Sequence, residues 1–394
     1  MDRAMFTRAA LCADAAARTR LTDFGTSGDG WADALDALVE STLAESQLRD
    51  LAAFRELLLH HLGNRLRIHA CLAKFPAILA THVPRPLFVS GLPRAGTTTF
   101  SRLLGEDPRI RTLRLWELHS PAPTDLAHPW ALTEDRIAAA EQLVLARARQ
   151  GTLAIRPISL FLPDECFYLM RNSFNSDHLH RADARRPSYF HWLDRHDRAG
   201  VYAYYRVQIQ LLLWQRRCPP DGHVVLKNPF VHLENMCTVF RLFPEATLVN
   251  LTRDIASVVK SLCFKNRADR AARSDHVRAE DVGADMVENL DIYYRRRAAE
   301  LAALTPAQRA RVVTIDHAAW AGDPVAVVRR IYELTGQPFD DALARAMAAA
   351  LPNHGRYGAQ THYDLAEFGL REAELRERFE PHEAAFRAQT GAIG

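Results

Sequence analysis

The sequence contains few lysines, few cysteines and no long apolar run, and each shortage narrows the possible functions. Its six cysteines are scattered without a C-x-x-C pair, which argues against a zinc site and against a compact disulfide framework. No apolar run approaches the ~20 residues of a membrane-spanning helix. Aspartate and arginines interrupt the alanines of the N-terminal stretch, unlike in a secretory signal. We therefore expect a reduced cytoplasmic protein with no transmembrane segment and no metal.

Charge of one sign does not accumulate anywhere along the chain. The net charge is +3, and no block of five like charges occurs, so a nucleic-acid partner is not expected. Only four of the 50 basic residues are lysines, which together with the abundant alanine is typical of a GC-rich bacterial genome. With 394 residues and 48% hydrophobic content, the chain can bury a large core. Apolar helix faces are also compatible with a homo-oligomer.

One segment leads from an apolar run through a turn rich in glycine and proline to threonines at a predicted helix start. Gly91 and Gly96 have the spacing of a nucleoside-triphosphate P-loop, but Thr97 stands where that loop carries its lysine. The cation is instead Arg94, inside the loop. Backbone N–H groups in such a turn, with the dipole of the following helix, favour an anion. The segment therefore predicts a phosphate cradle that is not suited to ATP hydrolysis.

This loop resembles the 5′-phosphosulfate loop of sulfotransferases that use 3′-phosphoadenosine 5′-phosphosulfate (PAPS). The similarity is greatest to the bacterial branch and to the tyrosylprotein sulfotransferases. The resemblance implies that six consecutive residues bind the donor: Arg94, Ala95, Gly96, Thr97, Thr98 and Thr99.

Two later segments support the same family. An apolar strand ends at Lys227, where ligands of open α/β sheets bind. A second strand runs into Arg253 and a helix that carries Ser261, eight residues further on. This spacing resembles the pair that binds the 3′-phosphate in PAPS-dependent sulfotransferases. Each motif is weak alone, but their order along the chain is specific.

A general base is expected shortly after the loop. Alternation over residues 107–119 predicts an extended segment in which Glu117 and His119 share one face. The resemblance places a carboxylate here, which makes Glu117 the candidate base and His119 the reserve. Alternatively, Glu117 forms an ordinary ion pair with one of three arginines, Arg109, Arg111 and Arg114.

Three further segments receive predictions. Asp164 and Glu165 precede a predicted helix, which favours a capping role. His317 stands where the family has a tyrosine near the adenine. The loop from Asn353 to Gly358 is expected to close over the nucleotide.

The predicted fold is α/β, a P-loop-like three-layer fold with a central parallel sheet. Strands are expected near 86–90, 223–227, 247–251 and 311–315. Residues 1–85 form an N-terminal helical cap, and 86–394 form the sulfotransferase domain. A helical insertion at 116–222 is expected on the acceptor side.

The resemblance implies a sulfotransferase that moves a sulfuryl group from PAPS to a hydroxyl of a small-molecule, sugar or lipid acceptor and releases 3′-phosphoadenosine 5′-phosphate (PAP). Glu117, Arg94 and Lys227 are the predicted catalytic residues. Two alternatives remain at this point: a small-molecule kinase that uses the same loop, and a catalytically silent nucleotide-binding protein.

Overall fold

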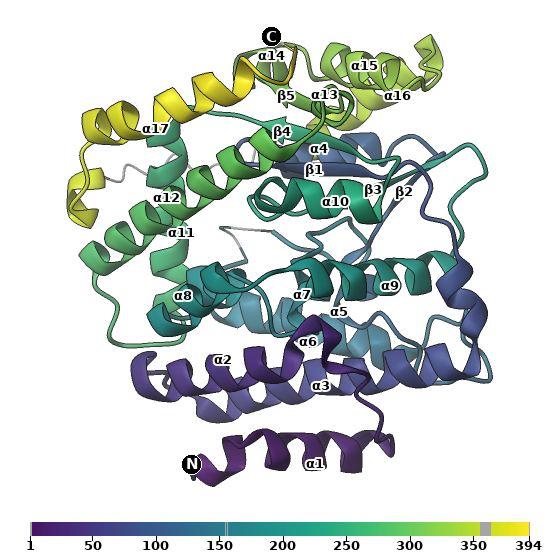
Figure 1. Cartoon of the computed structure of the whole chain (residues 1–394), viewed down its shortest axis with the longest axis vertical. Helices are drawn as coiled ribbons and strands as arrows, with labels where there is room; N and C mark the ends of the chain where they lie inside the picture. Colours follow the sequence, from purple (N-terminus) through teal and green to yellow (C-terminus); the bar gives the residue numbers. More distant parts are fainter. Residues whose placement is uncertain (1, 154, 156, 355–363, 394) are drawn as a thin grey trace.

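A computed structural model of the chain, which describes residues 2–153, 155, 157–354 and 364–393, contains a six-stranded sheet. The strands are β1 (Leu87–Gly91), β2 (Ile110–Thr112), β3 (His223–Lys227), β4 (Thr247–Leu251), β5 (Val312–Ile315) and β6 (Gly391–Ile393). Their order is β2-β3-β1-β4-β5-β6, and every pair of neighbours is parallel. The prediction of a central parallel sheet is thus confirmed (Figure 1).

The strands form because short apolar runs are buried on both faces of the sheet. Leu87 and Val89 belong to one core cluster, while Phe88 between them belongs to another. This alternation is the two-residue period of a strand. Four strands lie where the sequence predicts them; the three-residue edge strands β2 and β6 were not predicted.

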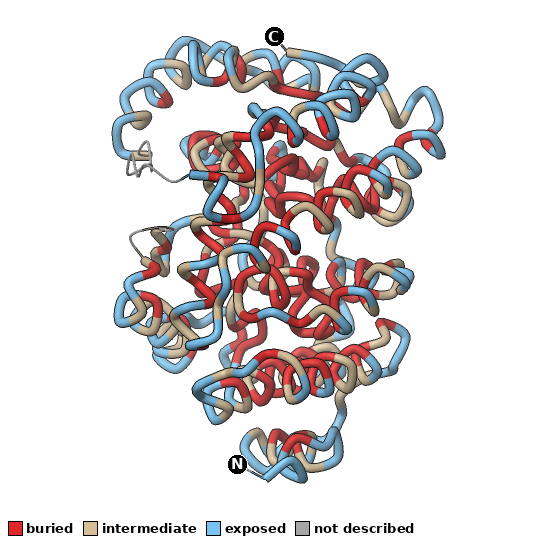
Figure 2. Tube along the Cα trace, turned by 90° about the vertical axis from the view of Figure 1, so that its left-hand side faces the viewer, coloured by how far each residue is buried: buried red, intermediate tan, exposed pale blue. Residues whose placement is uncertain are grey.

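Helices cover both faces of the sheet. On one side lie α4 (Thr97–Leu104), α14 (His317–Gly322), α15 (Pro324–Leu334) and α16 (Asp341–Ala350). The other side packs against α10 (Met236–Leu242), α11 (Ile255–Ala271), α12 (Ala279–Ala303) and α17 (Glu372–Arg387). The sheet is therefore the middle of three layers, and Figure 2 shows the buried residues gathered in the interior of the molecule.

The predicted extended segment over 107–119 is only partly correct. Residues 110–112 form β2, but Leu115–His119 form the short helix α5. Glu117 supports the start of this helix, because its carboxylate accepts a hydrogen bond from the backbone N–H of the N-cap residue Arg114 at 2.8 Å. Glu117 and His119 therefore do not share a strand face.

Helices outside the sheet layers form the lower part of the molecule in Figure 1. The N-terminal region contains α1 (Arg8–Thr19), α2 (Trp31–Glu45) and α3 (Leu51–Lys74). The segment between β2 and β3 adds α5, α6 (Glu134–Arg149), α7 (Phe167–Arg171), α8 (Pro187–Arg195) and α9 (Ala199–Gln215), as the predicted helical insertion requires. Phe174, Leu179 and Tyr189 of this insertion share one core cluster with the N-terminal helices.

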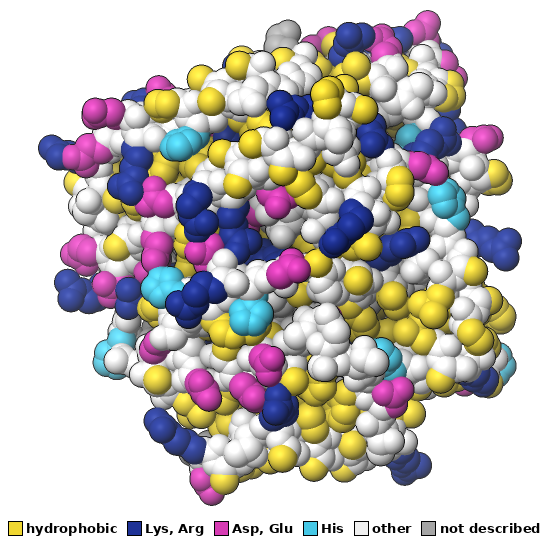
Figure 3. Space-filling model, viewed as in Figure 1, with side chains coloured by type: hydrophobic (Ala, Val, Ile, Leu, Met, Phe, Trp, Pro, Cys, Tyr) yellow, Lys and Arg dark blue, Asp and Glu magenta, His cyan; other side chains and the backbone are white. Residues whose placement is uncertain are grey.

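The surface fits the balanced composition. Basic and acidic side chains are interspersed on the face drawn in Figure 3, in keeping with the net charge of +3. Among the described residues, no helix combines the length and the apolar character needed to cross a membrane.

Candidate active site

Two glycines shape the turn between β1 and α4. Gly91 and Gly96 have φ angles of 102° and 99°, a region that side chains other than glycine rarely adopt. A Cβ on Gly91 would lie 2.3 Å from the carbonyl oxygen of Leu251, and one on Gly96 would lie 2.5 Å from Nε1 of Trp320. The loop therefore requires glycine at both positions.

The helix α4 follows this turn directly, and its N-terminus has no side-chain cap from any residue that the structure describes. Gly96 is the N-cap residue, and no described side chain accepts a hydrogen bond from the first turn. Thr97, Thr98 and Thr99 of that turn line a cavity of about 1010 Å³. Uncapped N–H groups and the positive end of the helix dipole make this wall of the cavity attractive to an anion.

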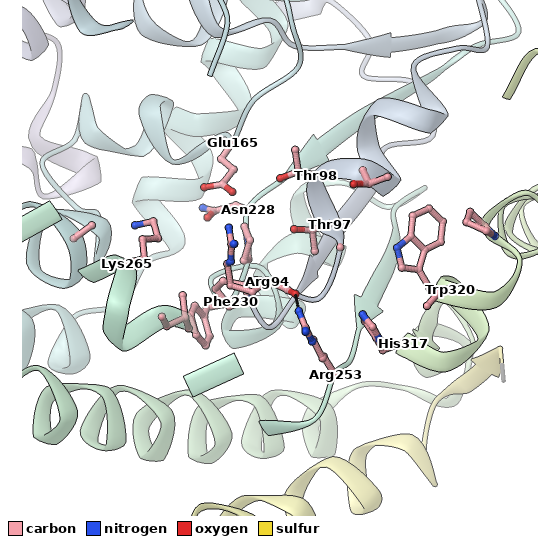
Figure 4. A pocket seen from close by; sticks show the side chains of 18 of the residues that line it. Arg94, Thr97, Thr98, Glu165, Asn228, Phe230, Arg253, Lys265, His317 and Trp320 are labelled. Atoms are coloured by element: carbon pink, nitrogen blue, oxygen red, sulfur yellow. Dashed lines mark hydrogen bonds between the residues drawn. The ribbon is translucent and has the colours of Figure 1, made fainter. Parts of the chain in front are cut away.

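The two basic turns predicted from separate segments meet in this cavity. Arg94 and Arg253 both line it, and Nη1 of Arg253 donates to the carbonyl oxygen of Arg94 at 2.9 Å (Figure 4). Nε of Arg94 donates to Oγ of Ser261 at 3.0 Å. Ser261 is thus beside the loop, although it is not among the cavity-lining residues. Ala95 is buried in the core, so only its backbone is available to a ligand.

Lys227 lies beside the main cavity, in a hollow of about 40 Å³ that also includes Arg94 and Thr98. The lysine is 2% exposed. Its Nζ donates to Oγ1 of Thr98 at 2.9 Å and lies 3.3 Å from Oε1 of Glu165. The end of β3 therefore brings a cation, a hydroxyl and a carboxylate together at the edge of the cradle.

The capping role predicted for Asp164 and Glu165 is wrong. The helix α7 begins at Phe167 with Cys166 as N-cap, and it has no side-chain cap among the described residues. Glu165 instead lines the main cavity. An acidic residue ahead of a helix looks like a cap in sequence, and only the fold places it against Lys227, which is 62 residues further along the chain.

Glu117 and His119 are not brought to the cavity. Glu117 is 2% exposed, and its carboxylate accepts hydrogen bonds from the guanidinium of Arg111. The ordinary ion pair considered above is therefore present, and its partner is Arg111. His119 packs against the ring of His60, and its partial burial lowers the pKa of His119 well below its usual value.

Two non-glycine residues of the cavity have left-handed backbones. The φ angle is 69° for Arg94 and 66° for Phe230. Such conformations cost about 1 to 3 kcal/mol each and cluster at functional sites. In Phe230 the conformation is accompanied by a hydrogen bond from its N–H to the carbonyl of Gly91, at 2.9 Å.

The opposite end of the cavity contains His317 and Trp320 (Figure 4). Burial, assisted by the charge of Arg253, lowers the pKa of His317, so the neutral imidazole is favoured at neutral pH. Of the predicted closing loop, Asn353 and His354 end a 3₁₀ turn (Leu351–His354), and residues 355–358 lie outside the described residues.

A parallel sheet whose first strand ends in an uncapped, arginine-bearing cradle is an arrangement that favours an anionic ligand. The chain matches the family model described as "Sulfotransferase family" over residues 86–341, which is more than half of its length. It therefore belongs to the sulfotransferase family, as predicted, and is a sulfotransferase enzyme.

Solved structures of two mycobacterial sulfotransferases are similar to this chain. STF1 of Mycobacterium tuberculosis is 27% identical with a TM-score of 0.79, over 95% of this chain and 98% of that one. STF9 of Mycobacterium avium is 24% identical with a TM-score of 0.80, over 98% of each chain. No curated protein sequence matches this chain. In the described ranges, no group of three or more His, Cys, Asp and Glu side chains is arranged to hold a metal.

Proposed function

We propose that this sulfotransferase uses PAPS as donor, transfers its sulfuryl group to a hydroxyl and releases PAP. The observation that carries the proposal is that Arg94 and Arg253 line one cavity beside an uncapped helix N-terminus. A donor with phosphate groups at two ends of one adenosine needs two separate basic sites within a single cavity. The absence of a lysine at Thr97 argues against a kinase.

The described residues fit such a donor. The first turn of α4 and Arg94 would hold the 5′ end, since both offer donors at the cradle that Gly96 leaves open. Arg253 and Ser261 would hold the 3′-phosphate. The rings of His317 and Trp320 would lie along the base.

The donor supplies an activated sulfuryl group. As the acceptor oxygen bonds to sulfur, the bond from sulfur to the bridging phosphate oxygen breaks and negative charge grows on that oxygen. Arg94 and Lys227 are the cations at the cradle that would stabilise this charge. Fixed donors of this kind typically contribute about 3 to 4 kcal/mol each.

Glu165 is the carboxylate that we assign to the acceptor proton. The assignment is supported by its place in the cavity lining, beside Lys227 and Thr98. Glu117 remains the base predicted from the resemblance, but its carboxylate is occupied by Arg111. Comparing variants of the two glutamates therefore decides between them.

Calorimetric titration of the purified protein with PAP, with ATP, and with each in the presence of magnesium tests the donor. We expect tight PAP binding that does not depend on magnesium. Selective binding of ATP with magnesium would favour the kinase, and failure of the protein to bind PAP would contradict PAPS as the donor.

A further inference from the structure

We propose that the acceptor is a carbohydrate, bound at the end of the cavity lined by Asn228, Asn266 and Asp177. This rests on the proposed sulfuryl transfer and adds the chemical class of the acceptor. In Figure 4, Asn228, Glu165 and Lys265 lie on one side of Arg94, and His317 and Trp320 lie on the other. The side with His317 is assigned to the nucleotide above, which leaves the Asn228 side for the acceptor.

The cavity is large for a site that binds one small molecule. Its volume of about 1010 Å³ is at the upper end of the ~300–1,000 Å³ typical of a site for one small molecule. A nucleotide that contacts the α4 cradle, Arg253 and Trp320 occupies one end. The remaining space suits an acceptor of one or two sugar rings.

Two primary amides of the cavity lining have unused hydrogen-bonding capacity. Asn266 is only 5% exposed, and its side chain makes no hydrogen bond to any residue that the structure describes. Asn228 is 4% exposed, and its amide makes only a 3.5 Å contact to Sδ of Met170 within the same set of residues. Amides both donate and accept, as sugar hydroxyls do. Buried polar groups are normally satisfied, so these two point to a polar ligand.

The charges at this end are already neutralised by protein partners. Nη2 of Arg181 lies 2.7 Å from Oδ2 of Asp177, and Nζ of Lys265 lies 2.7 Å from Oδ2 of Asp269. A charged acceptor would have to compete with these ion pairs. A neutral acceptor leaves them intact, and the paired groups still have hydrogen-bonding positions to offer.

The wall at this end also includes an aromatic side chain. Phe230 lines the cavity, with the guanidinium of Arg181 at 4.0 Å from its ring centroid. Arg181 belongs to a π-helical turn (Leu179–Asp183), a rare element that occurs often at functional sites. This turn and the residues just before it place Asp177, His178 and Arg181 in the lining together.

A phenol or a steroid would satisfy this site less well. Either would cover Asn228 and Asn266 without matching their hydrogen bonds, and an unsatisfied buried polar group costs about 1 to 3 kcal/mol. A saccharide offers hydroxyls to both amides. The shared chemistry is a neutral sugar, which is present in free oligosaccharides and in the headgroups of glycolipids.

Calorimetry on the PAP-saturated protein tests the proposal with four probes: maltose, dodecyl maltoside below its micelle concentration, p-nitrophenol and a tyrosine-containing peptide. We expect maltose and dodecyl maltoside to bind at least tenfold more tightly than p-nitrophenol and the peptide. Tighter binding of maltose indicates a free saccharide, and tighter binding of dodecyl maltoside indicates a glycolipid. If neither maltose nor dodecyl maltoside binds, or if p-nitrophenol or the peptide binds as tightly as these two sugars, the carbohydrate proposal is overturned.

A variant pair separates this inference from the proposed function. We expect Asn266→Leu to weaken maltoside binding about tenfold, the effect of losing roughly one hydrogen bond, while PAP affinity stays within about twofold of wild type. Met286→Leu changes an apolar residue of the same cavity and should leave both affinities unchanged. Unchanged maltoside binding in Asn266→Leu contradicts the acceptor site. Failure of the wild type to bind PAP contradicts the sulfuryl-transfer proposal instead.

Discussion

Glu165 and Lys227 lie 3.3 Å apart where β3 ends, so a carboxylate and a cation stand side by side at the edge of the phosphate cradle. The lysine also donates to Thr98 in the first turn of α4. Strand, helix and insertion thus meet at the point where group transfer would occur.

Replacement of Glu165 should stop turnover without preventing donor binding. We expect Glu165→Gln to lower kcat by about 10²- to 10⁴-fold, the usual contribution of a positioned base, with PAP affinity within about threefold of wild type. Sulfuryl transfer is measured by mass spectrometry of the modified acceptor. Near-normal kcat in Glu165→Gln, together with a severe loss in a folded Glu117→Gln protein, would return the base role to Glu117.

Replacement of Glu117 should mainly cost stability. The carboxylate and the guanidinium of Arg111 are both buried, and removing one partner of a buried ion pair typically costs about 3 to 5 kcal/mol. Urea denaturation of Glu117→Gln measures the loss. Glu333→Gln, in an exposed pair with Arg330, is the matched control and should leave the unfolding midpoint unchanged. Equal midpoints for all three proteins would contradict the structural role.

Arg253 should determine recognition of the 3′-phosphate. We expect Arg253→Ala to weaken PAP binding by about 10- to 100-fold, because hydrogen bonds to charged groups contribute roughly 1.5 to 3 kcal/mol. AMP lacks the 3′-phosphate, so its affinity should hardly change. Titrations with both nucleotides measure the difference, and Arg241→Ala on α10 serves as the surface control. An equal loss for PAP and AMP would place the contact elsewhere.

The cradle should not tolerate a methyl group at Gly96. The φ angle of 99° is strained for alanine, and the new Cβ would collide with the indole of Trp320. We expect Gly96→Ala to weaken PAP binding at least tenfold. Gly28→Ala is the control, since a Cβ there would lie 3.6 Å from its nearest neighbour, in ordinary contact. Wild-type PAP affinity in Gly96→Ala would show that the indole is not fixed against the loop.

Acid should destabilise the protein through the histidines between α3 and α5. Burial lowers the pKa of His60 to about 4, and it lowers the pKa of His61 and His119 well below the usual value of 6.5. Between pH 6.5 and about 4 the unfolded chain binds protons that the folded chain does not. The free energy of unfolding should therefore fall with decreasing pH in this window, by up to ~1.4 kcal/mol per pH unit for each histidine.

Urea denaturation at pH 7.5 and at pH 5 measures this dependence. His60→Gln should reduce the difference between the two values. His128→Gln, at an exposed site, should not. If the free energy of unfolding is equal at both pH values, the histidines are not the cause.

Local sequence was sufficient for the strands that form the centre of the sheet. β1, β3, β4 and β5 are short, predominantly apolar runs bounded by turn residues, and this pattern is characteristic of strands buried on both faces. β2 and β6 have three residues each, which is too few for the two-residue hydrophobic period of a strand to appear. They form because each pairs with the edge of a neighbouring strand.

The site was predictable where its residues follow strand ends. Arg94, Lys227 and Arg253 come directly after apolar runs, so parallel strands bring them to one edge of the sheet. Glu165 belongs to the helical insertion, where no hydrophobic periodicity in the sequence predicts which way a side chain points. Glu117 was predicted as the base because the resemblance places a carboxylate shortly after the loop, and the alternation around it predicted a strand. The structure has the helix α5 there, and the Glu117 carboxylate accepts a hydrogen bond from the backbone N–H of the N-cap residue of that helix.

The N-terminal helices are connected indirectly to the end of the cavity that we propose for the acceptor. Leu179 packs in one core with Leu38 of α2 and Leu62 of α3, and it lies two residues from both Asp177 and Arg181. Substitutions within that core would therefore act on the wall proposed for the acceptor, whereas the proposed donor half is built on β1 and β4. Natural selection can in this way alter what such an enzyme modifies without rebuilding its donor chemistry.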